Sequence, residues 1–306
     1  MKKLISKIIC VLLLVSFAFA LTACGDEVEN GSKITRVKLT VEFYDEEGVA
    51  TEYEVFAKLY ENFAPETVNH IKAKIESGYY NGTCISHVSS SYAQFGDYVL
   101  NDNGTLTAKD QGESILGEFY KTGWTGNTLN AASGALVLMR DNTVKGDAKY
   151  DTGKATIAIS YSASAFDSES YCIFGKLVSD DGDSESEDEM LQKSSYGKMY
   201  ALTERIADSN GRRVYYCTKY EADENADSEA EVYDWEGKYF TYIEYEDEYH
   251  YFEGVYANES EIRNANAVML SDEEADALAS EISKNPANFM NIPALKVIIK
   301  TVEIVK

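Results

Sequence analysis

Cysteine and histidine carry the widest range of side-chain chemistry in this sequence, as nucleophiles, acid–base groups and metal ligands. The three histidines (His70, His87 and His250) are isolated from one another, so no Cys/His cluster has the ligand spacing of a zinc site. The acidic run 180–185 lacks the ordered ligand positions of a calcium loop, and we interpret it as a solvated loop, with weak cation binding as the alternative. The sequence therefore predicts no metal site and no cofactor.

Cys24 lies in a motif with its own chemistry. Three lysines precede an apolar run, 8–20, in the layout of a secretory signal, and this run is too short for a comfortable membrane span. The next residues, Leu21-Thr22-Ala23-Cys24, resemble the bacterial lipobox, in which the thiol is acylated and the chain is cut just before it. We expect residues 1–23 to be a lipoprotein signal peptide, with Cys24 anchored on the extracytoplasmic face of a bacterial cell membrane. An ordinary signal peptide that contains a cysteine is the alternative.

Three cysteines remain once Cys10 leaves with the signal and Cys24 is acylated. These are Cys84, Cys172 and Cys217, an odd number with no short-range pairing, so they define no disulfide framework. Two alternatives stay open: one disulfide formed in an oxidising space, or three separate half-buried thiols.

Charge and composition limit the class of protein. The chain has 306 residues, with 52 Asp and Glu against 28 Lys and Arg, and its net charge is -24. Nucleic-acid binding is excluded because it needs a basic stripe. Hydrophobic residues make up 44% of the chain, enough for one or two cores, so global disorder is excluded as well. Processing would remove three lysines and no acids, and the polar segment 24–33 would then be a tether.

Short β-strands dominate the elements that must position any site. Apolar and polar residues alternate over 37–43 and 53–59, which predicts an antiparallel hairpin, and further strands are expected at 83–88, 93–99, 134–140, 154–160 and 171–178. Pro65 opens a predicted helix that ends at Gly78. A second helix is expected at about 190–208, with Met199, Leu202 and Ile206 inward, and a last strand at 295–305. Many short strands with few helices indicate a sandwich or a closed barrel.

Six segments agree, in order, with those of one known family. The first runs from 64 to 83 and is similar to APKTVENF followed by GYYDGT; the others are 94–97 (QFGD), 115–119 (ILGEF), 134–140 (GALVLMR), 173–177 (IFGKL) and 297–304 (VIIKTVEI). Together they resemble the cyclophilin-type peptidyl-prolyl isomerases. The resemblance covers 34–206 and 292–306, and it implies a mainly β fold, an eight-stranded antiparallel barrel capped by two helices.

The resemblance also implies site residues, and here the sequence departs from the family. The family's catalytic arginine lies in an FHR segment, where this chain has Ile85-Ser86-His87, so His87 takes its place. Gln94 matches the family's glutamine, although the stretch between His87 and Gln94 is one residue shorter. The substrate pocket implied by the resemblance consists of Tyr92, Met139, Ala158, Phe166 and Tyr171, in which Ala158 replaces a phenylalanine, Phe166 stands near the tryptophan and Tyr171 replaces the histidine.

The missing arginine matters because of the reaction. Rotation about a peptide bond has a barrier of about 18–20 kcal/mol, and a catalyst must bind the twisted amide better than either planar isomer. A guanidinium is permanently charged, whereas a histidine is mostly neutral above about pH 6.5. We therefore expect His87 to be a poorer donor, with a rate that rises as the pH falls through about 6.5. Arg140 is a second candidate for the missing charge, and both residues also fit a role outside catalysis.

An acidic, tyrosine-rich insertion, 207–291, separates the two family-like portions. Between Glu221 and Glu261 there are fifteen acids and one basic residue, and ten tyrosines lie between Tyr215 and Tyr256. The pattern predicts a small β-meander, followed by a helix that opens with a capping box at Ser271. This α+β subdomain is either a solvated unit packed on the barrel or a recognition surface for basic or extended polypeptide.

Two classes of function follow. The first is a membrane-anchored peptidyl-prolyl isomerase that assists the folding of secreted proteins, with activity weakened or lost. The second is an inactive scaffold that binds extended or Pro-containing polypeptides without turnover. In either case we expect the partners to be unfolded or Pro-containing polypeptides and a membrane reached through the lipid, and we expect a monomer.

Overall fold

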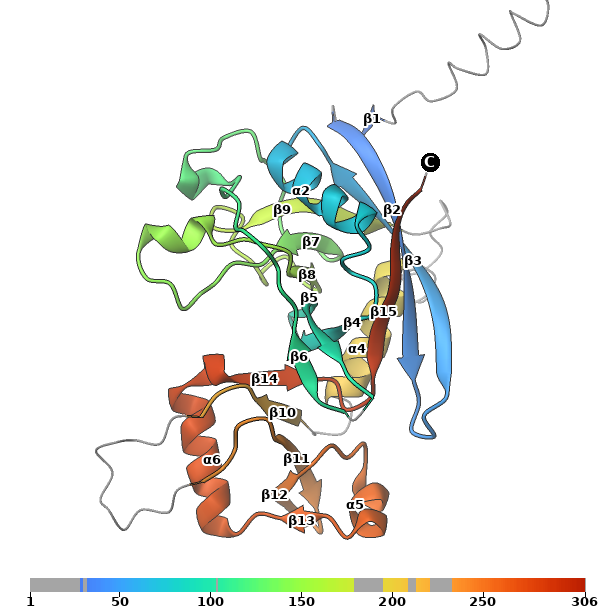
Figure 1. Cartoon of the computed structure of the whole chain (residues 1–306), viewed down its shortest axis with the longest axis vertical. Helices are drawn as coiled ribbons and strands as arrows, with labels where there is room; N and C mark the ends of the chain where they lie inside the picture. The colour runs from blue at the N-terminus through green and yellow to red at the C-terminus, as the bar shows by residue number, and fades with distance from the viewer. Residues whose placement is uncertain are drawn as a thin grey trace, which may run out of the picture.

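The computed structural model describes residues 28–29, 32–102, 104–178, 195–208, 213–220 and 233–305 (Figure 1). Cys24 and the acidic run 180–185 lie outside these residues. Part of the predicted tether is ordered, because Val28–Glu29 forms strand β1 and pairs with the start of β2. That part of the tether prediction is therefore wrong: backbone pairing with the barrel begins before residue 33.

Eight antiparallel strands close into a barrel, in the order β2-β15-β4-β5-β8-β7-β9-β3, with β3 returning to β2. Their bounds are β2 Ser32–Tyr44, β3 Ala50–Tyr60, β4 Thr83–Val88, β5 Tyr92–Leu100, β7 Ala135–Leu138, β8 Ile157–Ser160, β9 Cys172–Val178 and β15 Val297–Val305. Strand β6, Leu106–Ala108, pairs with β5 outside this ring. The predicted eight-stranded antiparallel barrel is confirmed.

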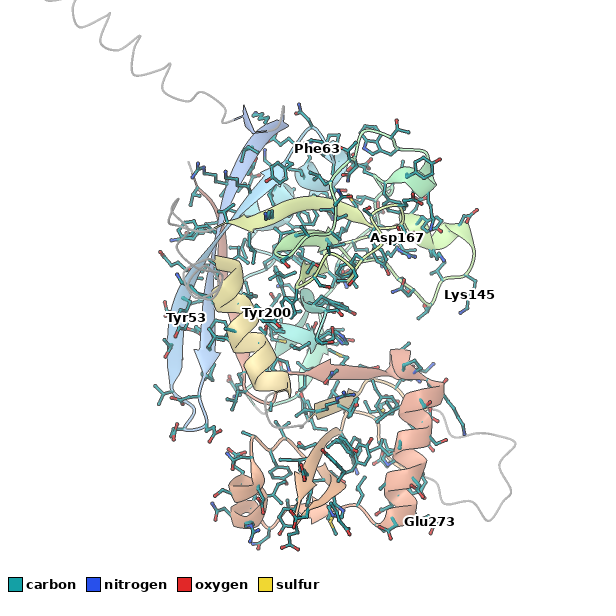
Figure 2. The ribbon with its side chains drawn as sticks, turned by 180° about the vertical axis from the view of Figure 1, so that it is seen from behind. Tyr53, Phe63, Lys145, Asp167, Tyr200 and Glu273 are labelled. Atoms are coloured by element: carbon teal, nitrogen blue, oxygen red, sulfur yellow. The ribbon has the colours of Figure 1, made fainter. Side chains whose placement is uncertain are left out.

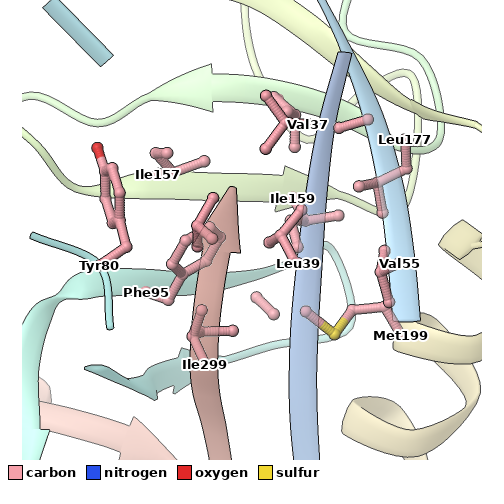
Figure 3. Close-up of a cluster of buried hydrophobic side chains, with 14 of the residues drawn as sticks. Val37, Leu39, Val55, Tyr80, Phe95, Ile157, Ile159, Leu177, Met199 and Ile299 are labelled. Atoms are coloured by element: carbon pink, nitrogen blue, oxygen red, sulfur yellow. The ribbon is translucent and has the colours of Figure 1, made fainter. Parts of the chain in front are cut away.

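The barrel interior follows from the alternation in the sequence. On β2, Val37, Leu39 and Val41 are buried while the residues between them are not, and Leu39 lies opposite Val55 of β3. Successive side chains of a strand point to opposite faces, so every second residue enters the barrel. Figure 3 shows Val37, Leu39 and Val55 converging with side chains of distant strands, among them Phe95 and Ile299. This closed interior is the main core of the molecule.

Two helices pack on the barrel, as predicted. They are α2, Pro65–Glu76, with Pro65 in its first turn, and α4, Ser195–Asp208. Met199 of α4 is fully buried against the barrel core, and Tyr161 shares a hydrogen bond with Thr203 of the same helix. Tyr200 lies on this helix in Figure 2 and meets Tyr161 edge to face. The side chain of Ile206 is outside the described part.

Glu118, from the ILGEF segment, caps the start of α2. Its carboxylate accepts hydrogen bonds from the backbone N–H groups of Glu66 (2.9 Å) and Thr67 (2.7 Å). Ala64, which precedes the helix, has no side chain that could do this, and the first N–H groups of a helix lack partners within the helix. Two segments that are about 50 residues apart are thus joined by one buried carboxylate.

The insertion folds as a second sheet with two helices. The strand order is β13-β12-β11-β10-β14. The bounds are β10 Arg213–Cys217, β11 Tyr239–Tyr245, β12 Glu248–Glu253, β13 Val268–Met269, β14 Phe289–Ile292, α5 Glu259–Ala265 and α6 Asp272–Lys284. Ser271 and Glu274 form the predicted capping box of α6. Short 3-10 helices occur at η1 Tyr120–Thr122, η2 Asp147–Asp151 and η3 Pro286–Asn288.

Part of the contact between the second sheet and the barrel is apolar and lies beside β6. Val214, Tyr216 and Ile292 are buried together with Leu106 of β6 at their edge. The hydroxyl of Tyr239 donates to the carbonyl of Gly104 at 2.6 Å. The insertion is therefore attached beside β6, outside the barrel interior.

The three remaining cysteines are free thiols. Cys84, Cys172 and Cys217 are all buried, and burial raises the pKa of Cys84 and Cys172 to about 12. Of the two alternatives left open by the sequence, the structure has separate thiols. Among the described residues, no helix combines the length and the apolar character needed to cross a membrane.

Candidate active site

The predicted site residues gather on the outer face of the barrel. On β5, Ala93 and Phe95 enter the core, so Tyr92 and Gln94 project from the opposite face. Gln94 pairs with His87 of β4 and with Ala158 of β8. Directly paired residues of antiparallel strands share a face, so His87, Gln94 and Ala158 all lie on this outer side.

Three rings form what we call the aromatic row: Tyr92, Phe166 and Tyr171. The ring centroids of Tyr92 and Phe166 are 5.0 Å apart, and those of Phe166 and Tyr171 are 5.2 Å apart. His87 stacks on Tyr92 at one end, with centroids 5.1 Å apart and planes 25° from parallel. Arg140 stacks on Tyr171 at the other end, with its Cζ 4.3 Å from the ring centroid.

All five predicted pocket residues belong to one apolar cluster. Ala158 and Phe166 are buried in it, while Tyr92, Met139 and Tyr171 are half-buried at its surface. Ala158 has no exposed surface, so in this arrangement it supports the row from below and does not face a substrate. The small side chain thus leaves room for Phe166 to pack over the strands.

His87 is half-buried, and its environment holds it neutral. Burial lowers the pKa of its imidazole to about 4. Protonation of His87 therefore needs a much lower pH, and the expected rise in rate moves from about pH 6.5 toward pH 4. At neutral pH the imidazole offers a single N–H donor.

Gln94 is held by a buried carboxylate beneath it. Its Nε2 donates to Asp97 Oδ2 at 2.6 Å, and Ser86 Oγ donates to Asp97 Oδ1 at 2.5 Å. These bonds fix the orientation of the Gln94 amide, with one of the two N–H groups of Nε2 bound to Asp97. The pKa of Asp97 is raised by burial and lowered in part by the bonds from Ser86 and Gln94.

Arg140 is enclosed by two tyrosine rings. Besides Tyr171, its Cζ lies 5.2 Å from the ring centroid of Tyr150. The Nε and Nη1 atoms are buried without a hydrogen-bond partner, although buried guanidinium donors are normally paired. With so little exposed surface, these atoms reach an acceptor of a bound molecule only if the side chain shifts.

Arg140 does not lie where the missing guanidinium was expected. It follows β7, whereas His87 is on β4, and β5 and β8 lie between them. Three strand spacings of about 4.8 Å separate the two backbones by roughly 14 Å. The structure places the two candidate charges at opposite ends of the aromatic row, so they do not serve the same substrate atom.

Sequence reasoning missed several residues that shape this site. Asp97 stood in the QFGD segment but had no assigned role, and its spacing of three from Gln94 was the available signal. Asn142 and Tyr150 were not found, because they lie between β7 and β8, in a turn and in the short 3-10 helix η2. Asn142 Oδ1 accepts a hydrogen bond from the Tyr171 hydroxyl at 3.3 Å. Loops bearing Lys145 and Asp167 lie on one side of the barrel in Figure 2.

Within the described ranges, no group of His, Cys, Asp and Glu side chains could hold a metal ion.

Comparison with known proteins agrees with this geometry. Residues 49–184 match the family model described as cyclophilin type peptidyl-prolyl cis-trans isomerase/CLD. This part of the chain is therefore similar to a cyclophilin-type isomerase domain. The matched residues include β4, β5, β7, β8 and β9 with the whole aromatic row, and they end before the insertion.

Solved cyclophilin structures are similar to part of the chain. A cyclophilin-type isomerase from Cryptosporidium parvum is 22% identical, with 47% of this chain and 79% of that chain covered at a TM-score of 0.31. The same enzyme in the presence of the dipeptide Ala-Pro is 19% identical, with coverages of 50% and 84% and the same TM-score of 0.31. The cyclophilin AquaCyp293 from Hirschia baltica is 17% identical, with coverages of 47% and 66% and a TM-score of 0.31. No curated protein matches the chain.

Proposed function

We propose that this protein is a lipid-anchored peptidyl-prolyl isomerase that acts on secreted polypeptides outside the cytoplasmic membrane, with a weakened catalytic step. The isomerase domain supports the class of reaction. The observation that carries the proposal for the site is the aromatic row, which joins Tyr92, Phe166 and Tyr171 on the outer face of the barrel. The half-buried rings of Tyr92 and Tyr171, with Phe166 buried between them, offer an apolar surface for a proline ring.

The proposed mechanism needs no covalent step. The proline ring packs on Tyr92 and Phe166, and the preceding carbonyl turns toward the end of the row where His87 and Gln94 lie. His87 donates one N–H to the twisted amide, and Gln94, oriented by Asp97, contributes its remaining N–H. Stabilisation of the twisted state lowers the barrier only to the extent that these donors bind it better than the planar isomers.

The weakness of the catalytic step follows from His87. A neutral imidazole has one N–H where a guanidinium has a charged fork of donors, and hydrogen bonds to charged donors are about twice as strong. Arg140 cannot compensate at this end of the row. We assign Arg140 instead to an acceptor group of the substrate chain beyond the proline, since its Nε and Nη1 are buried without a partner.

A second candidate function is a binding scaffold without turnover. The specific observation in its favour is the burial of His87, which keeps the imidazole neutral at physiological pH. A scaffold would retain the affinity of the aromatic row for proline and lose only the donor.

An isomerase assay on a short Xaa-Pro peptide separates the two candidates. The proposal predicts that the full chain accelerates isomerisation over buffer and that His87→Arg raises the rate further. Binding of the peptide with a rate equal to buffer would favour the scaffold. His87→Ala tests the role of the imidazole, because an unchanged rate would show that His87 takes no part.

Membrane anchoring has its own test. The lipobox-like segment before Cys24 supports it. In cells, Cys24→Ala should be released from the membrane fraction or left unprocessed. Full membrane retention of a correctly processed Cys24→Ala protein would contradict the proposed anchor.

A further inference from the structure

The insertion has a pocket of its own, far from the aromatic row in sequence. Its volume is about 310 Å³, and it is lined by Tyr233, Asp234, Trp235, Lys238, Phe240, Glu253, Leu270 and Glu274. The rings of Tyr233 and Trp235 are stacked, with centroids 4.7 Å apart and planes 9° from parallel. An aromatic wall beside several carboxylates is typical of a site for a cationic group.

The charge of the pocket is negative. Lys238 is paired with Glu253 at 3.5 Å, which leaves the carboxylates of Asp234 and Glu274 as the net charge of the lining. Ser271 donates two hydrogen bonds to Glu274, through its backbone N–H at 2.8 Å and its hydroxyl at 2.9 Å. These bonds lower the pKa of Glu274, so it is a carboxylate at neutral pH.

A platform of tyrosines continues from the pocket along the same face of the sheet. Strands β11 and β12 pair Phe240 with Glu253, Tyr242 with Tyr251, and Glu244 with Tyr249. Paired residues of neighbouring strands share a face of the sheet, and so do residues two positions apart on one strand. The pocket residues Phe240 and Glu253 therefore lie on the same face as Tyr242, Tyr249 and Tyr251. Ile243 and Phe252, which follow Tyr242 and Tyr251 in the strands, pack on the opposite face against α5.

These tyrosines are in ring contact and partly open to solvent. The centroids of Tyr242 and Tyr251 are 4.8 Å apart, and those of Tyr242 and Tyr249 are 5.4 Å apart with nearly parallel planes. Tyr249 is 56% exposed. From the pocket at Glu253 to Tyr249 is four residues of strand, or roughly 13 Å, which an extended chain of four or five residues would span.

We infer that this face binds extended polypeptide with a lysine or arginine side chain in the pocket and its neighbours laid over Tyr251, Tyr242 and Tyr249. Charge favours a cationic polypeptide over an anionic one. The segment 221–261 has fifteen acids and one basic residue, so it attracts a cationic partner and repels an anionic one. The cation sits against Trp235 and Tyr233, between Asp234 and Glu274. The surface is separate from the aromatic row, so this inference does not depend on isomerase activity.

Titration of the full chain with a proline-free peptide of about eight residues tests the inference. The peptide carries lysines at alternate positions, and a matched peptide carries glutamates there; neither has a proline to occupy the barrel. The chain has two tryptophans, and Trp124→Phe leaves Trp235 as the only indole, so its fluorescence reports on the pocket directly. We expect the lysine peptide to change the Trp235 signal at micromolar concentration, the glutamate peptide to leave it unchanged, and added salt to weaken binding.

Matched variants locate the site. The double variant Asp234→Asn with Glu274→Gln removes the negative charge of the pocket. It keeps the cap of α6, because glutamine also serves in a capping box. It should weaken binding of the lysine peptide about tenfold, or about 1.4 kcal/mol. Tyr249→Ala should weaken binding as well. Glu248→Gln is the control: Glu248 is on the same strand but on the opposite face, with a side chain 79% exposed.

Three results would overturn the inference. One is equal binding of the lysine and glutamate peptides. Another is an equal loss in Glu248→Gln and in the Asp234/Glu274 double variant. The third is a Trp235 response to an N-acetylglucosamine oligomer but none to the lysine peptide, which would make the tyrosines a sugar platform.

Discussion

The inner and outer faces of the same barrel strands differ in how much of each face is formed by the alternating strand residues themselves. On the inner face, Phe95, Ile157 and Ile159 are large, buried and packed against residues from distant strands. On the outer face, Ala158 lies between Ile157 and Ile159 and is covered by Phe166, which comes from a loop. The inner face is built by strand residues alone, whereas the outer face depends on what the loops place over it.

This difference is a physical reason to expect, as the sequence does, that the scaffold resembles the cyclophilin-type family more closely than the site does. A barrel interior must be filled by the strands that enclose it, so volume and period are constrained together. The outer face can exchange a floor residue for a loop residue. Phe166 supplies a ring beside Ala158, whereas the end of the aromatic row at His87 has an imidazole that burial keeps neutral.

Truncation of one residue on each face should give the largest difference between the faces, measured as loss in the free energy of unfolding. Phe95→Ala should lower the free energy of unfolding by about 3–5 kcal/mol, because Phe95 is only 2% exposed and the barrel cannot collapse around the cavity. Tyr92→Ala, three strand positions from it and on the outer face, should cost about 1–2 kcal/mol, since Tyr92 is half-buried. Urea denaturation measures both. Equal losses would remove the distinction between the faces.

Acid should destabilise the outer face through His87. Its pKa is lowered to about 4 in the fold and is about 6.5 in the unfolded chain, so between these values the unfolded chain binds a proton that the fold does not. Stability is full above pH 6.5 and is lost as the pH falls toward 4, by roughly 2 kcal/mol at pH 5.

His87→Phe is the matched variant for this prediction. It keeps a ring stacked on Tyr92 and removes the titration, so its stability should fall less than that of the wild type between pH 7 and pH 5. Parallel pH dependences of the two proteins would show that His87 is not held neutral by the fold.

Loss of the carboxylate at Glu118 should have a smaller effect. Glu118→Gln leaves one oxygen for the two backbone N–H groups at the start of α2, and we expect a loss of about 1–2 kcal/mol. Thermal unfolding measures the change. Glu113→Gln is the control, because Glu113 is exposed in the same loop region. A stability equal to that of the control would mean that α2 needs no cap from this segment.

Removal of the insertion should affect the barrel least. It is attached beside β6 through Leu106 and Gly104 and contributes nothing to the described barrel core cluster. Replacing residues 212–288 with a short Gly/Ser linker should leave a cooperative thermal transition. The free energy of unfolding should fall by about 1 kcal/mol, because the deletion exposes the barrel side of the apolar contact. Loss of the cooperative transition would show that both sheets form one folding unit.

Much of the fold was predictable, because it rests on local signals. The alternation over 37–43, Pro65 before an apolar helix face and the capping box at Ser271 each specify an element through backbone geometry. The barrel followed from segments whose order resembles one family. The start of β2 was not predicted, since the polar residues before 33 pair only through their backbones.

The site was predictable as a set of residues but not as an arrangement. The five pocket residues do gather in one cluster. The neutral state of His87 depends on burial, and the distance between His87 and Arg140 depends on two intervening strands, neither of which is visible in the spacing of residues. Tyr150 reaches Arg140 from η2, a 3-10 helix of five residues that is too short to show a hydrophobic period.

The central claim is that the aromatic row binds proline and speeds its isomerisation. Two-dimensional exchange NMR on a short Xaa-Pro peptide measures this directly, because cis and trans signals are separate and uncatalysed exchange takes roughly 10–100 s. The account predicts exchange faster than in buffer with the wild type, and a return to the buffer rate with Tyr92→Ala combined with Phe166→Ala, in a protein that remains folded. Unchanged acceleration by this double variant would contradict the account, and so would wild-type exchange no faster than in buffer.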